Sequence, residues 1–335
     1  MMNDIKLFKS ISREETLEYI RQNNNIITNI DNRYLSSRAL LYLATGNQKA
    51  TKDGIIFIGN NCIDGLILNN GKNNLELLLE CIQSGNKVIN IHPDISKELL
   101  KMDYKVKSSV TRVMWAQYYM YGDKFSNLDT SEMKNYRRAV RKYSDNSLYD
   151  TIYYPNLEGC LEYNEIINLW DAWAEKQAGR KNFSKSKVRD MILNIPKAIK
   201  EAHLTNILLT VVKNKSGDIL AYSISELVNG KILYTIEAKY SYKFNLNDIN
   251  KYTLYAEWEY WKDKANIEYI NIGCGDQHYG SKADEKTLLD KDNPYNEEPL
   301  NMSKRNMRPD LAFFLDQYNT TRIYKKDLNK GLFDL

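Results

Sequence analysis

Residues 249–273, "INKYTLYAEWEYWKDKANIEYINIG", decide the fold because a helical pattern is followed directly by a strand pattern. Leu254, Trp258 and Trp261 recur at helical spacing, and further apolar residues widen this stripe. We therefore expect a helix over about 248–264 that is buried on more than one side, with Asp248 as its N-cap. The run "IEYINIG" then predicts a short strand that ends at a glycine.

Three strand patterns precede this helix, within residues 207–240. They read "ILLTVVK", "ILAYSISEL" and "KILYTIEAKY", separated by the turn sequences "NKSGD" and "NGK". Asn-Gly between two β-rich runs is a strong hairpin signal, so the segment predicts a three-stranded antiparallel meander. The strand after the helix should run parallel to the last meander strand. If it pairs with only part of that neighbour, the sheet splays and leaves a slot.

The first half of the chain shows a similar order of elements. "GIIFIGN" and "IDGLILN" predict strands, "NLELLLECI" a helix, "KVINI" a strand, "DISKELLKM" a helix, and "YKVKSSVTRVMWAQYYMY" a long strand. A length of 335 residues favours two domains. We expect two α/β (α+β) domains, residues 1–130 and 131–335, each with a mixed, largely antiparallel sheet flanked by helices.

Composition indicates an ordinary soluble protein, with 43% hydrophobic and 27% charged residues. No run approaches the roughly 20 apolar residues that span a bilayer, and the start lacks the layout of a secretion signal, so a cytoplasmic location is expected. The four cysteines form no C-x-x-C pair and there are three histidines, so no metal site is predicted. The net charge of +4 permits a polyanionic partner without requiring one.

The chain resembles a tandem of two domains of the GNAT acyltransferase superfamily. The resemblance lies in "GDILAYSISEL" and in residues 249–273, where a long aromatic helix precedes a glycine-ended strand. The second half looks most like the FemAB-type aminoacyltransferases and the lysyl-phosphatidylglycerol synthase catalytic domain. "MKNYRRAVRKYS", residues 133–144, looks like the basic helix before their second domain. The resemblance implies transfer of an acyl or aminoacyl group to an amine or hydroxyl, with the second domain active.

One departure concerns the acyl donor. GNAT enzymes that use acetyl-CoA carry a Q/R-x-x-G-x-G/A loop whose N–H groups cradle a pyrophosphate at a helix N-terminus. Here "SYKFNLNDINKY" has no glycine and "NNGKNNLE" has only Gly71. FemAB-type enzymes also lack this loop and take their aminoacyl group from tRNA. The resemblance thus implies no permanently bound cofactor and a donor co-substrate, either aminoacyl-tRNA or acyl-CoA, with the former favoured.

Glu237 is the first candidate for the base that such a transfer needs. It lies in "LYTIEAKY", on the strand where many GNAT enzymes place a glutamate. Simple alternation puts Glu237 and Lys239 on the face of Thr235, and Tyr240, a candidate substrate contact, on the opposite face. The alternative is an exposed glutamate that pairs with Lys239 or with a cross-strand lysine.

The end of the following strand offers further candidates. Asp276 and His278 come directly after it, and a carboxylate and an imidazole two residues apart can share a cleft. Gly273 and Gly275 would allow the backbone to approach a substrate closely, with strand-end amides as oxyanion donors. The alternative is that Asp276 and His278 only cap a polar loop, with the histidine exposed to solvent.

Two basic clusters could bind anions. Lys304, Arg305 and Arg308 in "SKRNMRPD" could hold a phosphate or carboxylate of the substrate, or form a solvated turn. The long polar loop before them, about 275–302, could fold over a substrate. The second cluster, in "KNYRRAVRKY", comprises Arg137, Arg138, Arg141 and Lys142, interleaved with Tyr136 and Tyr143.

Basic residues with interleaved aromatics suit tRNA or DNA, although a solvated interdomain helix explains them as well. Because the composition suggests an AT-rich genome, one acceptor hypothesis is a modified DNA base in a phage. A cell-wall peptide or a lipid is another. A non-catalytic nucleic-acid-binding module on a GNAT scaffold is the alternative of a different class. The oligomeric state stays open.

Overall fold

The computed structural model describes residues 12–22, 44, 48–51, 54–59, 62–69, 74–84, 86–91, 93–102, 110–176, 185–274, 288–290 and 299–319. The chain forms two compact units. Unit 1 comprises Met1–Tyr118, Cys274–Arg305 and Leu311–Leu335, and unit 2 comprises Tyr119–Gly273 and Asn306–Asp310. They are interleaved in sequence, whereas the sequence suggested contiguous ranges, 1–130 and 131–335. The reason is that the last described strand pairs with a strand of the first hundred residues.

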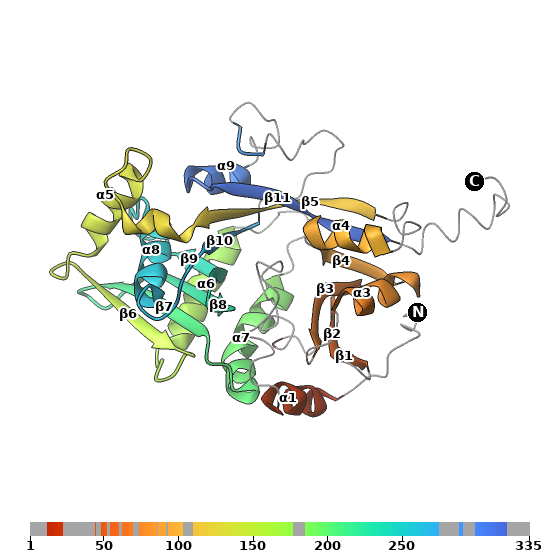
Figure 1. Ribbon diagram of the computed structural model, residues 1–335. Coiled ribbons are helices and arrows are strands. Elements are labelled where there is room, and N and C mark those ends of the chain that lie inside the picture. Colours follow the sequence, from red (N-terminus) through yellow and green to blue (C-terminus); the bar gives the residue numbers. More distant parts are fainter. Residues whose placement is uncertain are drawn as a thin grey trace. The chain divides into compact units, whose positions relative to one another are not determined.

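Unit 1 contains a mixed sheet with helices (Figure 1). Its elements are α1 (Arg13–Gln22), β1 (Gln48–Thr51), β2 (Gly54–Gly59), β3 (Cys62–Asn69), α3 (Asn74–Gln83), β4 (Lys87–Ile91), α4 (Pro93–Met102), most of β5 (Val110–Tyr121), most of α9 (Pro299–Asn306) and β11 (Leu311–Asn319). The strand order begins β1-β2-β3-β4-β11, with β3 and β4 parallel and the other three pairs antiparallel. Leu78 and Ile82 of α3 and Ile95 and Leu99 of α4 are buried, as their helical spacing predicts.

Unit 2 carries the predicted meander, helix and strand. Its elements are η3 (Gly122–Ser126), α5 (Lys134–Tyr143), β6 (Tyr149–Pro155), α6 (Tyr163–Lys176), α7 (Lys185–Ala202), β7 (Ile207–Asn214), β8 (Ile219–Val228), β9 (Ile232–Tyr240), α8 (Ile249–Trp261) and β10 (Tyr269–Cys274). The strands lie in the order β10-β9-β8-β7-β6. Strands β6 to β9 are antiparallel and β10 runs parallel to β9. The predicted fold class is confirmed. The elements that the sequence did not indicate are α1, β1, η3, β6 and α9.

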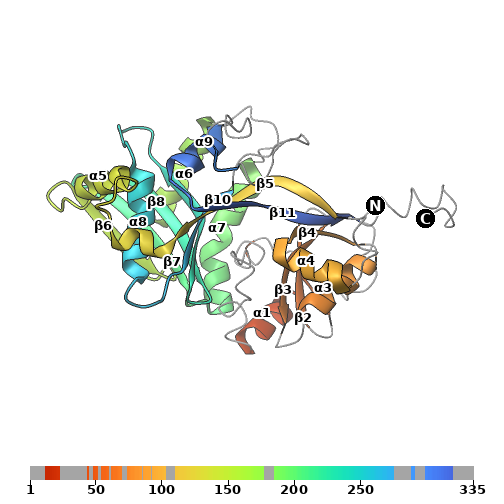
Figure 2. The same cartoon turned by 45° about the horizontal axis from the view of Figure 1, so that its top comes forward.

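Helices cover both faces of the unit 2 sheet (Figures 1 and 2). On one face α8 packs with α5 over the meander, in a cluster that includes Tyr143, Tyr252 and Ala256. On the other face α6 contacts β8 and β9 and packs on α7 through Trp170 and Ile192. Burial of α8 on more than one side is therefore confirmed, since Ile249, Leu254 and Trp258 are also buried.

The start of α8 differs in detail from the prediction. Asp248 does precede the helix, but it has a left-handed backbone (φ 63°) and makes no side-chain cap hydrogen bond. Its carboxylate instead pairs with Lys251, at 2.5 Å, and with Arg138 of α5. The Asp248 carboxylate is thus held by two cations and not by the amides at the start of α8. Within the described ranges, no helix is long and apolar enough to cross a membrane.

Candidate active site

The ladder between β9 and β10 is short. Tyr269, Ile270 and Asn271 pair with Ile232, Leu233 and Tyr234, respectively. Strand β9 continues to Tyr240 and stays paired with β8 throughout. Over the described residues, the edge of β9 beyond Tyr234 therefore has no partner in β10. Strand β10 thus pairs with only part of β9 over the described residues, which is the condition that the sequence analysis set for a slot.

A β-bulge lies just beyond the last β9–β10 pair. Thr235 is opposite Ser225 of β8 and Glu237 is opposite Ile224, so Ile236 is an extra residue in β9. A bulge adds one residue to the two-residue period and turns the following side chains to the opposite face. The expected alternation is therefore wrong: Glu237 and Lys239 share the face of Tyr234 instead of that of Thr235. Tyr240 in turn shares the face of Thr235.

Glu237 lies on the α6 face, where cationic and aromatic groups surround it. Its carboxylate forms an ion pair with Lys239, and the two side chains are only 13% and 15% exposed. The Lys239 ammonium lies 4.2 Å from the centre of the Trp173 ring of α6. Burial raises the pKa of the Tyr222 phenol, and the adjacent Glu237 charge raises it further. The pairing with Lys239 that the sequence offered as the alternative is thus observed, with both groups largely buried.

The end of β10 is held by Asn271, which the sequence analysis did not single out. Its side chain is fully buried. Asn271 Oδ1 accepts a hydrogen bond from Gly273 N at 2.7 Å, and Nδ2 donates to the Tyr119 hydroxyl at 3.2 Å. Gly273 has a φ of 90°, which favours glycine. Because the Gly273 amide is engaged by Asn271, the oxyanion role expected for it is not supported. A polar residue inside the apolar run "IEYINIG" was the available signal.

Glu257 on α8 is a second residue that sequence reasoning missed. Its side chain is 0% exposed, and its Oε2 accepts a hydrogen bond from Thr235 Oγ1 at 3.4 Å. Burial raises the pKa of Glu257 to about 7, and the hydroxyls of Ser223, Ser225 and Thr235 partly offset this effect. An acid inside a helix expected to be buried on several sides was the signal that could have identified it.

The other predicted strand-end residues cannot be placed in the same way. Gly275, Asp276 and His278 lie outside the described residues. Tyr240 is 39% exposed, and its ring centre lies 5.4 Å from that of Tyr242, itself 39% exposed. Tyr240 is thus accessible at the end of β9, as a substrate contact requires.

The three basic residues that were predicted to bind an anion of the substrate belong to different units. Lys304 and Arg305 are half-buried on α9 in unit 1, whereas Arg308 belongs to unit 2 and is exposed. A shared anion site of the three residues therefore stays a prediction.

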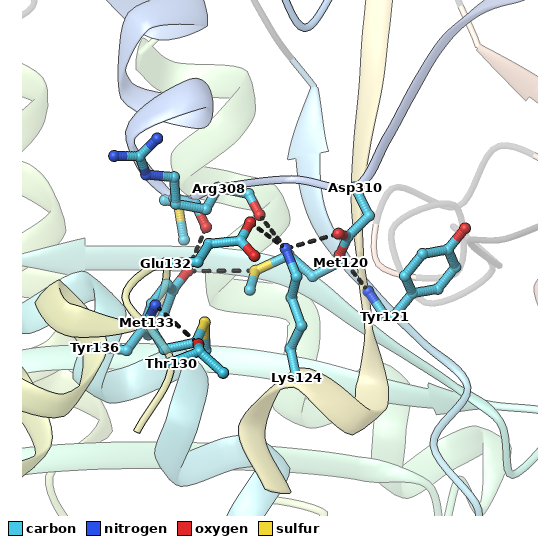
Figure 3. A network of polar contacts seen from close by, with 10 residues as sticks. Met120, Tyr121, Lys124, Thr130, Glu132, Met133, Tyr136, Arg308 and Asp310 are labelled. Carbon is cyan, nitrogen blue, oxygen red and sulfur yellow. Dashed lines mark hydrogen bonds and ion pairs between the residues drawn. The ribbon is translucent and has the colours of Figure 1, made fainter. Parts of the chain in front are cut away.

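A polar network anchors the Arg308 segment within unit 2 (Figure 3). Lys124 Nζ contacts Asp310 at 2.6 Å and Glu132 at 2.9 Å, and donates to the Arg308 carbonyl at 3.1 Å. Asp310 Oδ2 accepts from Tyr121 N at 2.8 Å. Arg308 has a φ of 60°, an uncommon conformation for a residue with a side chain. These contacts fix the chain from Arg308 to Asp310.

The basic helix α5 is confirmed, but its aromatic residues face inward. Tyr136 and Tyr143 are 0% and 1% exposed, and their hydroxyls donate to the carbonyls of Met307 and Asn247 at 2.8 and 3.0 Å. They are therefore not available to stack on bases in this fold, and nucleic-acid binding by the basic residues of α5 stays a prediction.

The basic residues of α5 fall into two pairs. Arg137 NH1 donates to the Leu128 carbonyl at 2.6 Å, and Arg138 pairs with Asp248. Arg141 and Lys142 are exposed, and the Lys142 ammonium lies 4.7 Å from the Tyr143 ring centre. Two cations of the predicted four thus serve contacts within unit 2. Across the described ranges, no group of three or more His, Cys, Asp or Glu side chains could hold a metal ion.

No family model matches the chain, and no curated protein matches its sequence. Solved structures do match. The C-terminal domain of a putative lysylphosphatidylglycerol synthetase from Agrobacterium fabrum gives a TM-score of 0.60 at 10% identity, covering 95% of this chain and 96% of that one. L-PGS from Bacillus licheniformis gives 0.60 at 13% identity, covering 94% and 96%. FemX gives 0.53 at 11% identity, covering 95% and 98%.

These comparisons define the class of fold: the chain has the fold of the lysylphosphatidylglycerol synthetase C-terminal domain and of FemX. Within that class it is similar over nearly its whole length to the lysylphosphatidylglycerol synthetase domain and to FemX. At these identities the likeness shows the fold alone.

Proposed function

We propose that this protein is an acyltransferase that moves an aminoacyl or acyl group onto an amine or hydroxyl, with unit 2 as the active unit. The observation that carries this proposal is the short β9–β10 ladder, which stops beside the Ile236 bulge. Peptide groups at a strand edge without a partner strand can hydrogen-bond a ligand. In acyl transfer, N–H groups placed in this way stabilise the oxyanion that forms on the attacked carbonyl.

The start of α8 favours an aminoacyl ester over acyl-CoA as the donor. A helix N-terminus binds the phosphates of a nucleotide when its amides are free and no negative charge lies nearby. Here the Asp248 carboxylate lies at the N-terminus of α8, and the cations that neutralise it are Lys251 and Arg138. A second anion at this place would compete with Asp248. Aminoacyl-tRNA is accordingly our proposed donor, with acyl-CoA as the alternative.

The acceptor is proposed as a class, an amine or a hydroxyl. A modified DNA base, a cell-wall peptide and a lipid headgroup all present such a nucleophile. The test is mass spectrometry of DNA, peptide and lipid fractions from cells that express the protein and from cells that do not. A covalent adduct with the mass of an amino acid or acyl group identifies the acceptor. If no fraction gains an adduct, the proposed function is wrong.

Which group removes the proton from the acceptor does not affect this test. Glu237, Asp276 and His278 are the candidates from the sequence. Lys304, Arg305 and Arg308 stay candidate contacts to an anionic part of a substrate.

The exposed Arg141 and Lys142 favour a second candidate function, a nucleic-acid-binding module without catalysis. With Tyr136 and Tyr143 buried, such binding would rest on phosphate contacts and would weaken steeply with salt. Salt-sensitive binding of tRNA or DNA without any transfer product would favour this function over the first.

A further inference from the structure

A two-residue connection runs from the unpaired edge of β9 into the core. Thr235 is the first residue beyond the last β9–β10 pair and is half-buried. Its hydroxyl donates to the Glu257 carboxyl at 3.4 Å, and Glu257 is fully buried. Among the described residues, Glu257 Oε1 has no hydrogen-bond partner. An acid placed in this way reaches the proposed site through Thr235.

Hydroxyl groups dominate the surroundings of Glu257. The register places Ser223 and Ser225 of β8 and Thr210 of β7 on the same face of the sheet as Thr235. The phenol of Tyr153 on β6 is close enough for the Glu257 charge to raise its pKa. From α5, the phenols of Tyr136 and Tyr143 donate to the backbone carbonyls named above.

These neighbours leave the protonation of Glu257 to burial and hydroxyl contacts. Burial raises the pKa of Glu257 to about 7, and among the described residues no charged side chain contributes to this value. A carboxyl that titrates near neutral pH can both accept and return a proton.

We propose that Glu257 is a positioning residue of the transfer reaction, which takes up the acceptor's proton through the Thr235 hydroxyl and returns it to the leaving group. The inference rests on the proposed function. The acceptor nitrogen or oxygen forms a bond to the acyl carbon and loses its proton to Thr235 Oγ1, whose own proton moves to Glu257 Oε2. When the bond between the acyl carbon and the leaving atom breaks, the same path returns the proton to that atom. One proton passes from acceptor to leaving group, with no oxidation or reduction.

The Ile236 bulge explains why Glu257 and not Glu237 serves this path. Beyond the bulge Glu237 lies on the α6 face, paired with Lys239, while Thr235 lies on the α8 face with Glu257. The two carboxyls therefore belong to opposite sides of the sheet, and Thr235 contacts Glu257.

The test measures transfer rate against pH for the full chain and for E257Q, T235V and T235S. Two donors are tested, a mixed pool of labelled aminoacyl-tRNAs and acetyl-CoA. Two acceptors are tested, glycerol and glycinamide, the latter at a constant concentration of its free base. In the wild type the rate should rise with pH to a plateau, with a midpoint near 7. In E257Q and T235V the rate should no longer increase with pH and should be about 100-fold lower than in the wild type. T235S keeps the hydroxyl and should retain both the pH dependence and the rate of the wild type. Unfolding curves show that each variant is folded.

The outcomes separate this inference from the function on which it rests. An active wild type with an unchanged rate and pH profile in E257Q overturns the relay and leaves the transferase proposal in place. Equal loss in T235V and T235S also overturns it, because the hydroxyl would then not matter. A wild type that transfers neither donor to glycinamide, to glycerol or to any of the DNA, peptide and lipid fractions overturns both.

Discussion

Asn271 Oδ1 accepts a hydrogen bond from Gly273 N at 2.7 Å, at the residue where β10 makes its last pair with β9. The side chain thus engages a backbone amide two residues further along the chain. Its Nδ2 group is tied to the Tyr119 hydroxyl, which fixes the orientation of the amide group. A polar residue in a buried strand thus holds the end of β10.

Replacing Asn271 by alanine should lower the free energy of unfolding by about 2 kcal/mol, because the Gly273 amide and the Tyr119 hydroxyl lose their partner. Tyr119→Phe should cost about 1 kcal/mol, since it removes one bond and leaves the contact with Gly273 intact. Urea denaturation of both variants measures the difference. If Asn271→Ala is no more destabilising than Tyr119→Phe, the contact with Gly273 does not hold the strand end.

Gly122 is required by the close approach of the backbone beside β10. A Cβ atom at this position would lie 1.9 Å from the Ile267 carbonyl oxygen, and Gly122 N donates to the Glu268 carbonyl at 2.9 Å. Gly122→Ala should therefore destabilise unit 2 by about 3 kcal/mol or more. Gly217→Ala is the control, because its φ of 88° is strained for alanine but the space around it is open. It should cost about 1 kcal/mol, and equal losses would contradict the steric argument.

The Lys124–Asp310 pair should be strongly coupled, because its side chains are 13% and 16% exposed. A double-mutant cycle with Lys124→Met and Asp310→Asn should give a coupling energy of about 1–3 kcal/mol. The exposed Lys231–Glu268 pair, at 40% and 39%, should give less than about 1 kcal/mol in the same cycle. Equal coupling in the two cycles would show that the network in Figure 3 does not anchor the segment around Arg308.

The raised pKa of Glu257 makes stability depend on pH in a defined direction. Its pKa is about 7 when folded and 4.5 in the reference state, so between these values the folded chain binds the proton and the unfolded chain does not. Stability from this group is complete below about pH 4.5 and is lost as the pH rises to about 7 and above. The difference between a pKa of about 7 and one of 4.5 corresponds to about 3 kcal/mol.

The difference in unfolding free energy between the wild type and E257Q should therefore move by about 3 kcal/mol in favour of E257Q between pH 4.5 and pH 8. Glutamine is uncharged at both pH values, so E257Q serves as the reference that lacks the titration of residue 257. Chemical denaturation at the two pH values measures the change. A constant difference would mean that Glu257 does not titrate in this range.

The sequence predicted the local elements of unit 2 because helical spacing, β-branched runs and Asn-Gly are local signals. It did not predict the Ile236 bulge, since the extra residue shows only in the pairing with β8. This single residue reversed the expected face of Glu237. The pairing of β11 with β4 was also hidden, because it joins residues more than 200 positions apart. Burial of Glu257 depends on packing from three strands, which the helix pattern alone does not give.

The most direct test of the account is intact-mass detection of a transferred group. Purified wild-type protein is incubated with labelled aminoacyl-tRNA and with DNA, peptide or lipid fractions, and each fraction is then analysed for label and for added mass. The account predicts a covalent adduct on one acceptor class that requires the protein and is strongly reduced in T235V. Unmodified acceptors in every fraction, with acetyl-CoA tested as the other donor, would contradict it.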